Sequence, residues 1–156
     1  MNSLFSQEFL NTSPKKVCDE ISINSYFSKK SIIDDKVIDK IMSETELFDL
    51  KFNSLEISSV HDHDGYYMSN GLAKSKTLFE LLTSKEIAEI SRQYLGEKFR
   101  LKCHRVYSVS SGAKNPWHTD DKKYGEKNQQ IKGLVFIIYL NDVYDGEFQA
   151  LKGSHL

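Results

Sequence analysis

The fold is decided by the stretch GLVFIIYL, residues 133–140, which is the longest apolar run in the chain. A helix that crosses a bilayer needs about 20 consecutive apolar residues, so this run is too short for one and we expect no transmembrane segment. Its β-branched and aromatic residues, with a glycine before it and an asparagine after it, are typical of a strand. The run therefore predicts a buried β-strand.

The sequence on both sides of this run has the same β character. Upstream, FRLKCHRVYSV at residues 99–109 is strand-like, and SSGAKNP at 110–116 has the composition of a turn. Downstream, NDVYDGE at 141–147 is a break, and residues 146–156 alternate apolar with polar side chains before a Gly-Ser turn. The second half of the chain is predicted to consist of antiparallel strands.

The first half has mainly helical patterns. We predict an N-terminal arm or short leading helix at residues 1–20, a strand at 21–27 (ISINSYF) and an amphipathic helix over 33–41. A second helical stretch is expected over 75–94, with Ser84 as a possible N-cap inside it and Gly96 at its end. Helices followed by antiparallel strands predict an α+β fold.

Composition excludes several classes of function. The chain has 156 residues, 39% of them hydrophobic and 28% charged, which predicts one soluble domain. Its 21 basic and 22 acidic side chains are scattered and give a net charge of -1, so no nucleic-acid partner is expected. The N-terminus lacks the basic start and the continuous apolar stretch of a secretory signal peptide, which favours a cytoplasmic protein.

Cys18 and Cys103 are too far apart for a Cys-x-x-Cys motif, and both are expected to be reduced and structural.

A candidate metal site lies in NPWHTDDKKYG, residues 115–125, between two predicted strands. His118 and Asp120 are separated by one residue, so on an extended backbone their side chains leave on the same face, and Asp121 points the other way. An imidazole and a carboxylate supply two corners of the 2-His-1-carboxylate triad that binds non-haem Fe(II). A hydrogen-bonded surface pair without metal is the alternative interpretation of the same spacing.

These motifs together resemble a known family. HTDD at 118–121 and the segment 133–156 look like the phytanoyl-CoA dioxygenase-like group of Fe(II)/2-oxoglutarate-dependent oxygenases. The shared features are the His-x-Asp pair, the hydrophobic strand, the turn at 141–146 and the Gly-Ser-His at 153–155. The resemblance spans roughly residues 21–156. It implies N-terminal helices packed on a partial double-stranded β-helix, which is a jelly-roll or cupin-like fold.

The resemblance also implies an activity and a set of site residues. His118 and Asp120 would bind Fe(II), and 2-oxoglutarate and O2 would be co-substrates in the hydroxylation of a small organic molecule. Arg105 and Tyr107, on one face of the strand before the metal pair, would contact 2-oxoglutarate, and Phe136 would form a pocket wall. A tyrosine packed in the core with a satisfied hydroxyl is the alternative for Tyr107.

The family pattern requires two residues that this sequence does not contain. A second histidine completes the iron site, and an arginine shortly after it binds the distal carboxylate of 2-oxoglutarate. His155 matches the Gly-Ser-His motif, so we do not expect it to be the third ligand. We therefore divide the chain into an arm, 1–20, and an incomplete domain, 21–156, that a further polypeptide segment would complete. The alternatives are a catalytically inactive jelly-roll module that binds a metal or ligand, and an interaction domain without metal.

Two other groups of side chains are candidate site residues. The cluster His61-Asp62-His63-Asp64 has metal-binding residue types, but the following Gly65 favours a solvated turn. The resemblance implies that His63, Tyr66 or Tyr67 meets substrate. His104 should share its side of the strand with Val106, away from Arg105, and is predicted to be structural.

Overall fold

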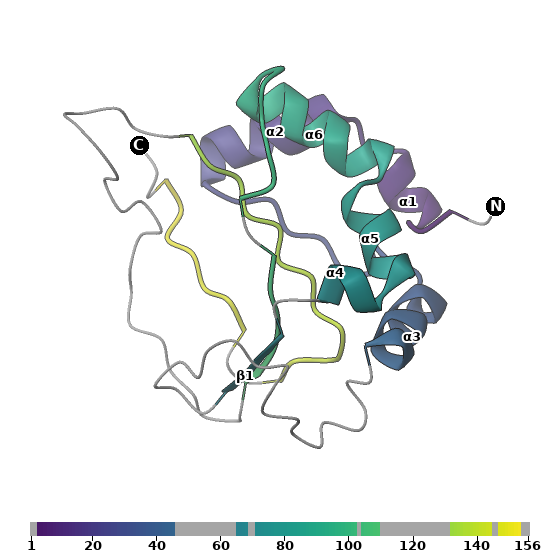
Figure 1. The fold of residues 1–156 in the computed structure, drawn as a ribbon. Coiled ribbons are helices and arrows are strands. Elements are labelled where there is room, and N and C mark those ends of the chain that lie inside the picture. The colour runs from purple at the N-terminus through teal and green to yellow at the C-terminus, as the bar shows by residue number, and fades with distance from the viewer. Residues whose placement is uncertain are drawn as a thin grey trace, which may run out of the picture.

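The computed structural model describes residues 3–45, 65–68, 71–102, 104–109, 132–144 and 147–153, for 65–68 and 107–109 the backbone alone. In this part of the chain the helices are α1 (Gln7–Leu10), α2 (Pro14–Asn24), α3 (Asp35–Glu44), α4 (Gly71–Lys74), α5 (Lys76–Leu82) and α6 (Lys85–Leu95). The strands are β1 (Gly65–Met68) and β2 (Val106–Val109). Figure 1 shows the helices in an arc on one side of the molecule and the extended segments on the other.

Side chains that cap the first turn define where most of these helices begin. The hydroxyls of Ser6, Ser13, Ser75 and Ser84, and the carboxylate of Asp34, each accept a hydrogen bond from a backbone N–H in the first turn. These caps satisfy donors that have no partner inside the helix. Ser84 accepts from the Ile87 N–H and separates α5 from α6, so the predicted helix at 75–94 is two helices.

The centre of the helical layer is the packing of α2 on α6, which lie side by side (Figure 1). Val17, Cys18 and Ile21 form the buried face of α2, and Ile90 is buried on α6. The Cys18 thiol donates to the carbonyl of Ile90 at 3.6 Å. The spacing of the α2 residues is that of one helical stripe, so burial of this face holds the two helices together.

The N-terminal residues belong to the core. Phe5 and Phe9 are both buried, with ring centroids 5.3 Å apart. Phe5 forms an isolated antiparallel bridge with Ile33, and the Ser6 N–H donates to the Ile32 carbonyl at 2.8 Å. The segment that precedes α2 is thereby attached to the segment that precedes α3.

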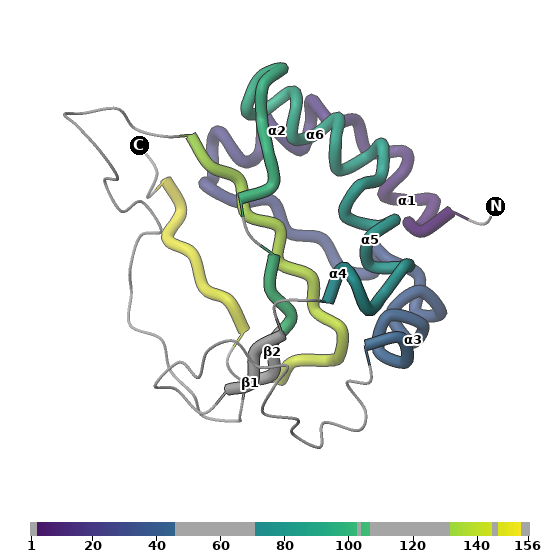
Figure 2. The backbone as a smooth tube through the Cα atoms, viewed as in Figure 1, coloured from purple at the N-terminus to yellow at the C-terminus, as the bar shows by residue number. Residues whose placement is uncertain are grey.

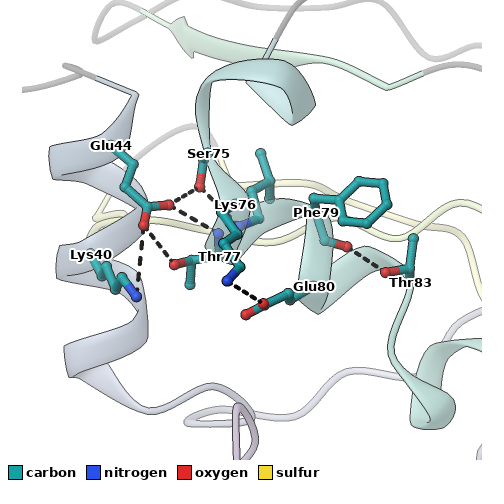
Figure 3. Close-up of polar contacts among 9 residues, drawn as sticks. Lys40, Glu44, Ser75, Lys76, Thr77, Phe79, Glu80 and Thr83 are labelled. Atoms are coloured by element: carbon teal, nitrogen blue, oxygen red, sulfur yellow. Dashed lines mark hydrogen bonds and ion pairs between the residues drawn. The ribbon is translucent and has the colours of Figure 1, made fainter.

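A carboxylate on α3 caps the start of α5 (Figure 3). Glu44 Oε2 accepts from the Ser75 hydroxyl at 2.6 Å and from the Thr77 N–H at 3.0 Å, and Oε1 accepts from the Thr77 hydroxyl at 2.9 Å. Lys40, one turn earlier on α3, lies 3.8 Å from Oε1. Residues more than thirty positions apart in sequence are therefore connected by one side chain.

Strands β1 and β2 form an antiparallel pair. The register places Gly65 opposite Val109, Tyr66 opposite Ser108, Tyr67 opposite Tyr107 and Met68 opposite Val106. Strand β1 lies at the end of the molecule away from α2 and α6 (Figure 1). Since β1 leads towards α4 along the chain, the pair adjoins the α4 and α5 side of the helical layer.

Residues 132–140 run as an extended segment alongside the helices (Figure 2). Leu134, Ile138 and Leu140 are partly buried against the core, whereas Ile137 and Tyr139 are exposed. The ammonium of Lys132 lies 4.2 Å from the centroid of the Tyr94 ring on α6. Further along the chain, the Gly153 N–H donates to the Asn24 carbonyl at 3.2 Å.

The α+β prediction, with helices on a partial double-stranded β-helix, is wrong for the part of the chain that the structure describes. In that part helix is the main regular structure, and the only sheet is the two-stranded β1–β2 pair. Residues 133–140 have the extended form and the alternation of a strand but belong to no ladder of the described residues. Strand pairing requires a neighbouring strand, and a short apolar run cannot specify that neighbour.

The predicted strand over 21–27 is also incorrect, because residues 21–24 are the last turn of α2. Ser13 caps this helix and Pro14 occupies its first turn, where a proline needs no hydrogen-bond donor. Ile21 follows Val17 by four residues and continues the same buried stripe. The apparent alternation at 21–27 arose from the end of a helical stripe, which local pattern cannot distinguish from a short strand.

Candidate functional site

The predicted metal ligands His118 and Asp120 lie outside the described residues, as do Asp121, His155 and the cluster at 61–64. Of the predicted site residues, the structure describes Arg105 and Phe136 with their side chains, and Tyr66, Tyr67 and Tyr107 by their backbone alone. Within the described ranges, no group of three or more His, Cys, Asp or Glu side chains is placed to hold a metal ion.

Tyr107 is positioned by β2. It is the register partner of Tyr67 on β1, a residue that the sequence also associated with the substrate site. Residues directly opposite in an antiparallel pair are backbone neighbours across the two strands. The β1–β2 register thus brings together two tyrosine positions that are 40 residues apart (107 minus 67).

Arg105 and Val106 show the alternation predicted for this strand. Arg105 is exposed, whereas Val106 is buried. His104 and Val106 both approach Gly71, the first residue of α4, so they share the side that faces the helices. The prediction that His104 lies with Val106 and away from Arg105 is confirmed.

Phe136, the predicted pocket wall, is a partly exposed side chain. Its side chain is 38% exposed, on the extended segment whose neighbours Leu134 and Ile138 pack against the core. Val135, Ile137 and Tyr139 are also exposed, so apolar side chains lie on the surface of this segment. The extended form was predicted from sequence, but its burial was overestimated.

His104 has a feature that the sequence did not indicate. Its Nδ1 atom is buried and has no hydrogen-bond partner in the described structure. Burial lowers the pKa of the imidazole below its ordinary value of 6.5. Alternation along the strand could place this histidine on the inner face, but no sequence signal shows whether a ring nitrogen finds a partner.

Cys18 is a buried structural thiol, as predicted. Burial raises its pKa above the ordinary 9.0, the adjacent Asp19 carboxylate raises it further, and Lys132 partly offsets both effects. A thiol in this environment is a poor nucleophile because the thiolate is disfavoured. Cys103 lies outside the described residues.

No helix among the described residues combines the length and the apolar character that crossing a membrane requires. In comparisons with known proteins, no family model, no curated protein and no solved structure matches this chain.

Proposed function

We propose that this chain binds Fe(II) through His118 and Asp120 and contributes them to a 2-oxoglutarate-dependent oxygenase that hydroxylates a small organic molecule. The observation that carries the proposal is the order of motifs in the sequence: His-x-Asp at 118–120, the apolar segment at 133–140 and Gly-Ser-His at 153–155. The proposal depends on these ligands and their order.

The chemistry of the donor set fits the metal. A neutral imidazole and a carboxylate are the ligand types of non-haem Fe(II) sites, which keep open coordination positions. When bound, the iron supplies those positions to 2-oxoglutarate and O2. Cysteine ligands, which would favour zinc or an iron–sulfur cluster, are absent from the 115–125 stretch.

The described elements beside this stretch support the proposal. β2 ends at Val109, and residues 132–140 form an extended segment, so the His118–Asp120 stretch connects two extended segments in sequence. Arg105 is exposed next to β2, where a guanidinium can bind a carboxylate of 2-oxoglutarate through two parallel hydrogen bonds. Tyr107, opposite Tyr67, is the second residue that we assign to this co-substrate.

The complete site needs a second histidine and an arginine that are not present in this sequence. We propose that a further polypeptide segment supplies them. With two protein ligands alone, the ion would be bound weakly, because each missing ligand or supporting group typically lowers metal affinity by about 10-fold or more.

The test is metal binding by the purified chain under anaerobic conditions, measured by calorimetry with Fe(II) and with Mn(II) as a redox-stable substitute. We expect His118→Ala and Asp120→Ala each to lower the affinity by at least about 10-fold. Asp121→Ala is the matched control, because its side chain should leave on the opposite face, and it should bind as the unchanged chain does. His155→Ala should also have no effect.

The same samples distinguish the proposed oxygenase from an inactive binding module. Succinate formed from 2-oxoglutarate and O2, dependent on His118 and Asp120, would support the oxygenase. Metal binding that depends on both residues without any succinate, even when the chain is extended by its downstream sequence, would favour the inactive module. Binding that is unchanged in both alanine variants would contradict the proposal.

A further inference from the structure

His104 and Val106 occupy the space that a side chain on the first residue of α4 would need. A Cβ atom added to Gly71 would lie 2.8 Å from Val106 Cγ2, 3.0 Å from His104 Cε1 and 3.5 Å from Leu78 Cδ2. The imidazole and the valine therefore pack directly on the bare backbone at the start of α4. We call the contact formed by Gly71, Leu78, His104 and Val106 the His104 contact.

The His104 contact suits a neutral imidazole and opposes a charged one. Leu78 and Val106 are buried apolar side chains, and Nδ1 has no partner in the described structure. A neutral imidazole can leave this nitrogen as a bare acceptor, whereas an imidazolium must carry a proton on both nitrogens. His104 is half-buried and its Nδ1 atom is the buried one, so protonation would place a donor on Nδ1 among apolar groups, which costs free energy.

Charged groups on the surrounding elements do not relieve this cost. Burial is the sole cause of the lowered His104 pKa, with no contribution from a carboxylate. The single acidic group on α4 and α5 is Glu80, which pairs with Lys76 at 3.5 Å. The remaining charged group on α4 and α5 is Lys74, and the segment between α6 and β2 carries Glu97, Lys98, Arg100, Lys102 and Arg105. Of the acidic groups nearby, Glu97 pairs with Arg92 at 3.2 Å, and Glu44 on α3 accepts from Ser75 and Thr77.

We propose that His104 is a pH-sensitive latch, whose protonation detaches β2 from α4 while the α2–α6 core stays folded. Because the folded protein favours the neutral imidazole, the latch is fully closed above the ordinary pKa of 6.5 and loosens as the pH falls below it. β2 carries Tyr107, and Arg105 directly precedes it in the chain. The latch concerns the fold alone and does not depend on bound iron.

The experiment is a pH titration of the whole chain by NMR, from about pH 7.5 to about pH 5. Docking is measured by the nuclear Overhauser effect between the Val106 methyl group and the Gly71 Hα, which requires no signal from His104. A nuclear Overhauser effect between residues of α2 and α6, around Cys18 and Ile90, shows in the same sample whether the α2–α6 core is folded. We expect the Val106–Gly71 signal to disappear on acidification while the α2–α6 signal persists.

The matched variant is His104→Phe, which has a ring of similar size and no titrating nitrogen. In this variant the Val106–Gly71 signal should be retained at the acidic end. If wild type and His104→Phe lose the signal in parallel, or if the α2–α6 signal is lost with it, the latch is refuted. His104→Gln, which is polar and does not titrate, replaces His104→Phe if the latter does not fold.

The wild-type titration gives an independent check if neither variant folds. The His104 ring signal and the Val106–Gly71 signal must then change with the same midpoint, below the ordinary histidine value. A His104 midpoint at or above that value, or two different midpoints, would overturn the proposal.

Discussion

Glu44 shows how one residue can join two helices. Its carboxylate accepts three hydrogen bonds from Ser75 and Thr77 at the beginning of α5, where backbone donors lack partners within the helix. Burial alone would raise the pKa of this carboxyl, but the hydrogen bonds from Ser75 and Thr77, together with the Lys40 charge, outweigh it and lower the pKa. Glu44 is therefore ionised in the folded protein and stabilises the α3–α5 junction.

Replacing this carboxylate should destabilise the fold. Glu44→Gln removes the charge and turns an amide donor towards groups that themselves donate, so we expect a loss of about 1–3 kcal/mol in the free energy of unfolding. Urea denaturation at neutral pH measures it. Lys40→Gln is the control, because Lys40 is 63% exposed and 3.8 Å away, and it should change stability by less than about 0.5 kcal/mol.

The same junction should respond to acid. Because the folded-state pKa of Glu44 is lowered, its contribution is fully present above the ordinary value of 4.5 and is lost as the pH falls through the folded-state pKa. The stability difference between wild type and Glu44→Gln should therefore shrink on acidification. A difference that stays constant from neutral to strongly acidic pH would contradict this assignment.

Gly71 is required because its surroundings leave no room for a side chain, and not because of its backbone conformation. Gly71→Ala would place a methyl group 2.8 Å from Val106 Cγ2 and 3.0 Å from His104 Cε1, so one of these side chains must move. We expect a destabilisation of about 1–3 kcal/mol by thermal or urea unfolding. Gly133→Ala is the matched control, since nothing lies within 4 Å of its added Cβ. Equal effects at the two glycines would exclude crowding as the cause.

At the scale of elements, residues 132–140 have two unlike faces. Ile138 packs against the core, whereas Ile137 is 41% exposed. The two positions have the same side chain and are adjacent in sequence, so substituting each in turn compares burial alone.

We predict that Ile138→Ala lowers the free energy of unfolding by about 2 kcal/mol or more, because it removes methylene contacts with the core. Ile137→Ala should cost less than about 1 kcal/mol. Chemical denaturation of both variants gives the comparison. If the exposed residue proved the more costly, the face of this segment that contacts the core would have been assigned wrongly.

At the scale of the whole molecule, the core extends to the N-terminal residues. Phe9 is 6% exposed and contacts Phe5, and the same helical layer contains the buried face of α2. Phe9→Ala should therefore lower stability by about 3–5 kcal/mol, as expected for a buried aromatic residue. Ile23→Ala, at a position 66% exposed, should change it by less than about 0.5 kcal/mol. Similar thermal midpoints for Phe9→Ala and wild type would show that this segment is peripheral.

The sequence by itself determined the features that depend on neighbours along the chain. The helix with Ile41 on its buried face, the cap at Ser84 and the end of α6 at Gly96 all follow from contacts within a few residues. The His118-x-Asp120 pair is likewise a sequence feature, and the iron site that we propose for it is a prediction.

Only the tertiary structure decided the features that depend on distant residues. The continuation of α2 through residues 21–24 follows from its packing on α6. Three further features depend on which distant segment lies beside a given residue. They are the absence of a strand partner for 133–140 among the described residues, the cap of α5 by Glu44, and the lack of a described partner for Nδ1 of His104. Helical hydrogen bonds form within one segment, whereas strand pairing, inter-helix caps and burial are set by contacts between segments, which local patterns do not encode.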